Sequence, residues 1–126
     1  MKIFLFVIVI LTSCNFSDQT RTLSNNWIFV DEGHTDKAID GGSLHIPCEI
    51  LSYGYDENFI IASQKPTEDC FLGKDTFNYK NGTDKIYFWL LIHKSKKLLG
   101  PLTENEYLEA RSKYQVPASL KLNKIY

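Results

Sequence analysis

The hydrophobic and polar positions along the chain alternate mainly with a period of two, which indicates β-structure. One stretch, Ile86–Ile92, is apolar at both odd and even positions and is bounded by polar residues. Apolar residues on both faces are typical of a strand that is covered on both sides. We therefore predict that this stretch is the central strand of a sheet and that Leu98–Leu102 returns beside it.

A hairpin is predicted between residues 49 and 64. Glu49–Tyr53 and Phe59–Gln64 are rich in β-branched and aromatic residues, and the five residues between them, Gly54–Asn58, have the composition of a turn. We expect a register in which Tyr53 faces Phe59, because this pairing gathers apolar side chains on one face.

Shorter segments surround this hairpin. We expect a strand at Trp27–Val30, a loop at residues 34–43, a short strand that contains Phe77 and Tyr79, and an edge strand in the tail at residues 120–125.

A helix start is the sharpest local signal in the second half of the chain. Thr103 followed by Glu106 forms a capping box, in which each side chain satisfies a free backbone N–H. The predicted helix runs over residues 104–114, with an apolar stripe formed by Tyr107, Leu108, Ala110 and Tyr114. Together these elements predict an α+β fold, with a small antiparallel sheet of four to six strands and one C-terminal helix packed on it.

The first residues have the composition of an export signal. Lys2 precedes a nine-residue apolar run, Ile3–Leu11, and Thr12 and Ser13 then lead to Cys14. The run is too short to span a bilayer, which takes about 20 residues. The leucine-small-small-cysteine order resembles a bacterial lipoprotein signal. That resemblance implies cleavage before Cys14 and lipid attachment to its sulfur, whereas an ordinary secretory signal or an apolar N-terminal strand or helix are the alternatives.

The leader suggests a division of the chain into three parts. We predict a signal peptide at residues 1–13, a flexible polar tether at 14–26 and a single α+β domain at 27–126. Two acyl chains give stable anchoring, so we expect the mature protein to be held on a membrane of the cell envelope, facing the periplasm or the exterior.

Three segments also resemble a group of short bacterial lipoproteins of unknown function. They are an F-I-I-A-x-Q-x-P segment at Phe59–Pro66, a Y-x-W-x-I-x-x-K segment at Tyr87–Lys94 and a G-P-L-T-x-x-E-[FY] segment at Gly100–Tyr107. In the second segment, Leu91 and His93 replace the usual Ile and Asp. The Bacteroidota-like composition, rich in Lys, Asn, Ile and Tyr, agrees with this resemblance. It implies architecture and location, and it implies no activity.

Charge and cysteines narrow the classes of partner. The 14 basic and 15 acidic residues leave a net charge of −1, which argues against a nucleic-acid partner. Cys48 and Cys70 have two interpretations, a disulfide in an oxidising compartment or two buried free thiols. Neither cysteine is part of a Cys-x-x-Cys unit, which argues against zinc or redox chemistry.

Catalytic motifs are missing from the sequence. There is no Gly-x-Ser-x-Gly elbow, phosphate-binding loop or His-Glu-x-x-His. The histidines share no ligand spacing, and the acidic pairs at residues 31–32 and 56–57 and the acids Asp36 and Asp40 fall in predicted loops, where such side chains are usually solvated. We expect no catalytic residue, no metal and no cofactor.

These observations favour a binding protein over an enzyme. We expect a non-enzymatic, lipid-anchored module that binds a protein or an envelope component, for example as an inhibitor or immunity protein. Tyr55, at the predicted hairpin tip, is the candidate exposed contact. The alternative is a small hydrolase that acts on cell-envelope polymers.

Overall fold

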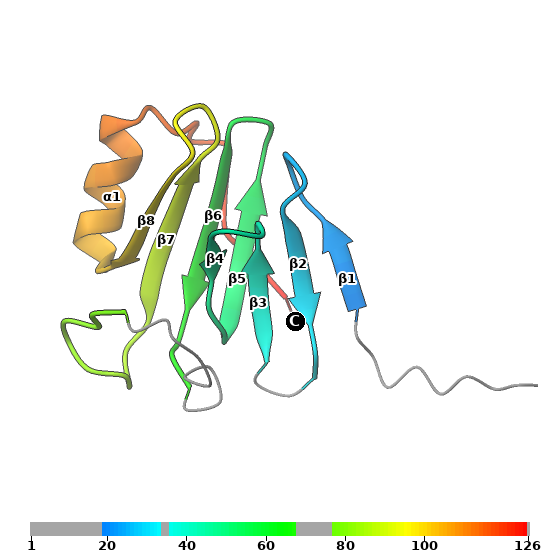
Figure 1. Cartoon of the computed structure of the whole chain (residues 1–126). Coiled ribbons are helices and arrows are strands. Elements are labelled where there is room, and N and C mark those ends of the chain that lie inside the picture. The colour runs from blue at the N-terminus through cyan, green and yellow to red at the C-terminus, as the bar shows by residue number, and fades with distance from the viewer. Residues whose placement is uncertain (1–18, 34–35, 68–76, 126) are drawn as a thin grey trace, which may run out of the picture.

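The chain forms two antiparallel sheets and a helix, which the computed structural model describes over residues 19–33, 36–67 and 77–125 (Figure 1). The first sheet has the order β1-β2-β3-β4, and the second has the order β8-β7-β6-β5-β9. The first consists of β1 (Gln19–Thr22), β2 (Ile28–Asp31), β3 (Lys37–Asp40) and β4 (His45–Ile46). The second consists of β5 (Ile50–Tyr55), β6 (Phe59–Gln64), β7 (Tyr87–Ile92), β8 (Lys97–Leu102) and β9 (Asn123–Lys124).

The five-stranded sheet has an apolar cluster on each of its faces. On one face it shares a core with the four-stranded sheet, to which Phe29, Ile39, Ile46, Ile60 and Trp89 belong. On the other face, Ile61, Leu90, Ile92, Tyr107 and Leu120 form a second cluster with the helix and the C-terminal segment. The protein therefore has three layers, in which the five-stranded sheet is the middle one.

The middle position explains the sequence of β7. This strand lies between β6 and β8 (Figure 1), and its side chains are almost all buried on both faces. The prediction of a central strand is confirmed, as is the return of the chain through β8.

Helix α1 (Glu104–Lys113) covers the outer face of β7 and β8 (Figure 1). It begins as predicted: Thr103 Oγ1 accepts a hydrogen bond from Glu106 N at 3.3 Å, and Glu106 Oε1 accepts one from Thr103 N at 3.1 Å. Tyr107 is buried and stacks on Phe88, with ring centroids 4.9 Å apart. Leu108 was predicted in the apolar stripe but is exposed, because its position on the helix faces away from the sheet.

The predicted hairpin exists, but its register was wrong. Tyr53 pairs with Ala62 rather than with Phe59, and an irregularity lies between Ile50 and Ser52. The turn is also shorter than predicted, since β5 continues to Tyr55. Asp56 Oδ1 accepts hydrogen bonds from the backbone N–H groups of Asn58 and Phe59, both at 2.8 Å, and this side chain closes the turn.

The four-stranded sheet itself was not predicted. Its strand β1 lies within the predicted tether, so strand structure is already present before Trp27. Strand β3 lies in the segment that we predicted as a loop. Both strands are short and carry polar residues, and their pairing with β2 supplies the backbone hydrogen bonds that define them.

The remaining predictions had mixed outcomes. The α+β class and the C-terminal helix are confirmed, and β9 is the predicted edge strand. Phe77 and Tyr79 are not in a strand. Instead, the Phe77 and Trp89 rings pack edge to face, with their centroids 5.1 Å apart. The predicted signal peptide and residues 14–18 of the predicted tether lie outside the described residues. In the described part of the chain, no helix is both long and apolar enough to cross a bilayer.

Candidate functional site

A polar cleft opens at one edge of the molecule, where the inner faces of the two sheets separate. Its volume is about 390 Å³. We call it the edge cleft and define it by Gln19, Arg21, Asp31, Tyr53, Tyr55 and Lys124.

Strand alternation places polar side chains on the inner side of this edge. Arg21 lies opposite Phe29, and Gln19 lies opposite Asp31. Since Phe29 belongs to the core between the sheets, all four side chains point toward the second sheet. The inner face of the β1–β2 pair is therefore apolar near the core and polar at the edge.

Strand β5 supplies the opposite wall. Tyr53 and Tyr55 are two residues apart and share a face. Tyr53 is buried and stacks on Phe29, with ring centroids 4.8 Å apart and an interplanar angle of 23°. Tyr55 is 42% exposed. The stacked pair closes the apolar core, and the second tyrosine extends the aromatic wall into the open cleft.

The charged groups of the edge cleft lie around this aromatic wall. Arg21 Nη1 donates a hydrogen bond to the Tyr53 hydroxyl at 3.2 Å, which orients the guanidinium over the cleft. Asp31 Oδ1 accepts a hydrogen bond from Gly33 N at 3.0 Å. Lys124 also lines the cleft, but on β9 it pairs with Ser52, so its side chain lies on the other face of the sheet from Tyr53. The Arg21 guanidinium is a cation that the cleft offers to an anionic group.

The C-terminal segment completes the cleft because a glycine allows it to cross β5 closely. A Cβ atom on Gly54 would lie 2.2 Å from the carbonyl oxygen of Lys121. Only a residue without a side chain permits this approach. Strand β9 then pairs with β5 through Ser52 and Tyr53, and this pairing positions Asn123 and Lys124 beside the cleft.

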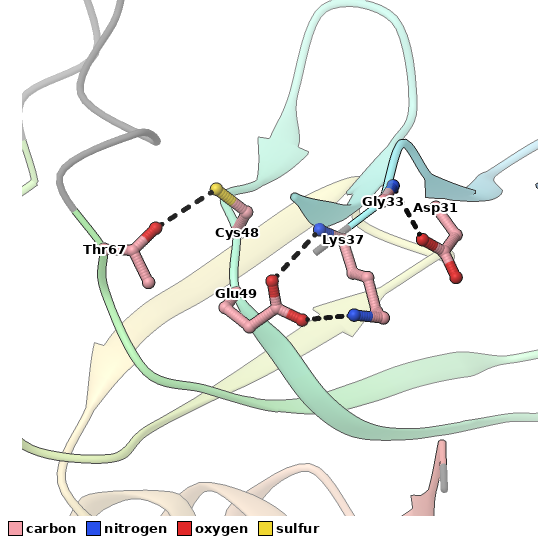
Figure 2. Close-up of polar contacts among 6 residues, drawn as sticks. All are labelled: Asp31, Gly33, Lys37, Cys48, Glu49 and Thr67. Atoms are coloured by element: carbon pink, nitrogen blue, oxygen red, sulfur yellow. Dashed lines mark hydrogen bonds and ion pairs between the residues drawn. The ribbon is translucent and has the colours of Figure 1, made fainter. Parts of the chain in front are cut away.

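A buried ion pair lies behind the edge cleft and joins the two sheets (Figure 2). Lys37 Nζ is 2.9 Å from Glu49 Oε1, and Lys37 N donates to Glu49 Oε2 at 3.4 Å. Lys37 lies opposite Asp31 in the first sheet. The ion pair therefore ties the strand pair β2–β3, which carries Asp31, to the start of β5.

A second cavity of about 260 Å³ lies by the turns at the other end of the strands, with Trp27, Leu44 and His93 among its lining residues. Beside it, the Ser24 hydroxyl and His93 Nε2 form a hydrogen bond of 2.6 Å. Burial lowers the pKa of His93, and the negative charge of Asp56 opposes this effect. The imidazole is therefore neutral at pH 7, with one ring nitrogen able to accept the serine proton.

The structure gives different positions to the residues singled out from sequence. Tyr55 is exposed at the end of β5 rather than at a hairpin tip. Asp56 closes a turn. The His45 ring packs against the Phe77 ring, with their centroids 6.1 Å apart. Among the residues that the structure describes, no three His, Cys, Asp or Glu side chains are grouped as metal ligands.

The cysteines are only partly described. Cys14 and Cys70 lie outside the described residues, as does His34. Cys48 takes part in a disulfide, and its Sγ is 3.7 Å from Thr67 Oγ1 (Figure 2). The pairing of Cys48 with Cys70 and the lipid on Cys14 stay predictions.

Sequence reasoning missed two groups of residues. Arg21 and Gln19 alternate with threonines, and this alternation was the available signal for a strand with one inward face. Ser24 and His93 are 69 positions apart and share no motif, so only the fold brings them together.

Comparison with known proteins identifies a family. No curated protein and no solved structure matches the chain. A family described as "Protein of unknown function (DUF3997)" matches residues 17–126. Since this match includes both sheets, the helix and the edge cleft, the chain belongs to the DUF3997 family.

Proposed function

We propose that this protein is a non-enzymatic, lipid-anchored module of the cell envelope that binds a ligand in the edge cleft. The observation that supports binding is the inward position of Gln19, Arg21 and Asp31 at an edge where the two sheets separate. Inward positions of packed sheets are normally apolar. Polar groups there are placed where a ligand can use them.

The chemistry of the cleft favours binding over catalysis. Arg21 supplies a positive charge and several N–H donors, and the aromatic rings beside it supply a surface for contact. One oxygen of the Asp31 carboxylate already accepts a hydrogen bond from Gly33 N. These groups suit recognition of a negatively charged ligand.

The lipid anchor is supported by the leader, which has the order of a lipoprotein signal up to Cys14. Gln19 is five positions after Cys14, so the chain between them spans at most about 18 Å. Because Gln19 lines the edge cleft, the anchor would hold the cleft close to the membrane surface, and its ligand would be a component of that region.

Two measurements test this proposal. Cys14→Ala is expected to move the protein from the membrane fraction to the soluble fraction, and unchanged membrane association would contradict the anchor. In a Cys14→Ala background, where no lipid holds the protein on the membrane, binding to purified envelope fractions is expected to fall when Arg21→Gln and Tyr55→Ala are added. The matched control is Thr20→Ala, which alters the outer face of β1. Equal binding by the double variant would contradict the cleft as the binding site.

The hydrogen bond between Ser24 and His93 favours one second candidate, a small hydrolase acting on envelope polymers. A serine beside a neutral histidine is the arrangement that activates a nucleophile. A fluorophosphonate probe would label Ser24 in a hydrolase, and His93→Gln would abolish that labelling. If wild type and Ser24→Ala are labelled equally, the hydrogen bond serves only to join the two turns.

A further inference from the structure

We infer that the ligand of the edge cleft is a saccharide that carries a carboxylate group. This inference rests on the proposed binding function and names the class of ligand for the same site. It follows from three features of the cleft, which are its charge, its exposed aromatic ring and the polar groups along its walls.

Arg21 offers a site for an anionic group. It lines the cleft together with Asp31, whose Oδ1 already accepts a hydrogen bond from Gly33 N. The Arg21 guanidinium uses Nη1 for the Tyr53 hydroxyl at 3.2 Å, and it has further N–H groups in the same plane. A planar guanidinium matches the two oxygens of a carboxylate.

The exposed tyrosine selects for a ring. Tyr55 is 42% exposed and continues the wall that begins with the stacked rings of Phe29 and Tyr53. The exposed part of the ring offers a flat apolar surface beside Arg21 in the cleft. The C–H face of a pyranose ring packs on such a surface.

The other polar groups suit hydroxyl groups. Gln19 and Asn123 present side-chain amides, which both donate and accept hydrogen bonds. The volume of about 390 Å³ is within the range of small-ligand sites, roughly 300–1,000 Å³. These features match a polyhydroxylated ligand of one or two rings.

The test uses digalacturonic acid, its dimethyl ester and the full-length protein purified in detergent, with affinity measured by calorimetry. The acid and the ester have the same rings and differ in charge. We expect the ester to bind at least about tenfold more weakly, because it loses the charge-assisted hydrogen bonds. Arg21→Gln is expected to make the two affinities equal, and Tyr55→Ala to weaken both by a similar factor. Thr20→Ala is the control and is expected to change neither.

Several outcomes would overturn the inference. They are equal affinities of the acid and the ester for the wild type, succinate binding as tightly as the disaccharide, or a diglutamate peptide binding more tightly than the disaccharide. The binding function fails separately, when in the Cys14→Ala background the double variant Arg21→Gln, Tyr55→Ala binds envelope fractions as well as its parent does. If that variant loses envelope binding and digalacturonic acid does not bind the wild type, the cleft is a binding site and the ligand class is wrong.

Discussion

Lys37 Nζ lies 2.9 Å from Glu49 Oε1, in an ion pair between two residues that are 4% and 9% exposed. Lys37 lies in β3 of the first sheet, and Glu49 directly precedes β5 of the second sheet. Figure 2 shows their side chains meeting between the strands. Buried charges are costly unless they are paired. This ion pair therefore holds the two sheets in one arrangement, with the edge cleft beside it.

Removal of one partner should destabilise the protein strongly. We expect Glu49→Leu to lower the free energy of unfolding by about 3–5 kcal/mol, because it leaves the Lys37 ammonium buried without its carboxylate. The double variant Lys37→Met, Glu49→Leu should lose far less than the sum of the two single variants. Urea unfolding of all four proteins measures this coupling, and additive losses would contradict the role of the ion pair.

Gln64 connects three elements of the core and should be equally sensitive. Its Oε1 accepts a hydrogen bond from Trp89 Nε1 at 2.7 Å, and its Nε2 donates to Cys48 O and to the Tyr79 hydroxyl, both at 3.0 Å. Gln64→Leu removes all three hydrogen bonds and should cost about 1–3 kcal/mol or more. Asn105→Leu, on the exposed face of α1, is the matched control and should change the free energy of unfolding little.

Gly54→Ala should disturb the cleft through the backbone. The new Cβ would meet the Lys121 carbonyl oxygen at 2.2 Å, so the C-terminal segment has to move. We expect a loss of about 1–3 kcal/mol and faster amide hydrogen exchange in β9, whose Ile125 neighbour donates its N–H to Leu51 O. Exchange at Leu90 in β7 is the internal control. Unchanged exchange at Asn123 and Lys124 would contradict the prediction.

The protein should lose stability on mild acidification because of His93. Burial lowers the pKa of this imidazole from its ordinary value of 6.5, although Asp56 opposes the shift. Between 6.5 and the lowered value, the unfolded chain binds more protons than the folded one, so the free energy of unfolding falls as the pH falls through this window. Above pH 6.5 this contribution is absent.

The variant His93→Gln isolates the effect. Its free energy of unfolding should fall less than that of the wild type when the pH is lowered from 7.5 to 5, while other groups titrate in both proteins. Urea unfolding at a series of pH values measures the difference. Parallel curves for the two proteins would show that His93 has the same pKa in the folded and unfolded states.

Local signals in the sequence predicted the elements that depend on neighbouring residues. Thr103 and Glu106 define the start of α1 because the capping box is closed within four residues. The hairpin shows the limit of such signals. The composition of Gly54–Asn58 suggests that the turn begins at Gly54, but β5 continues to Tyr55 and Asp56 closes the turn. The register depends on this later turn and on the irregularity near Leu51.

The sequence by itself determined the α+β class, the central strand β7 and the helix start. A strand that is buried on both faces is a continuous apolar run, and a capping box lies within four residues, so both are visible in neighbouring residues. Only the tertiary structure decided the four-stranded sheet, the Lys37–Glu49 ion pair and the edge cleft. Strand β1 has no apolar alternation and exists through its pairing with β2. The cleft requires Arg21, Tyr55 and Asn123 to meet from three distant segments, and long-range packing of this kind leaves no periodic pattern along the chain.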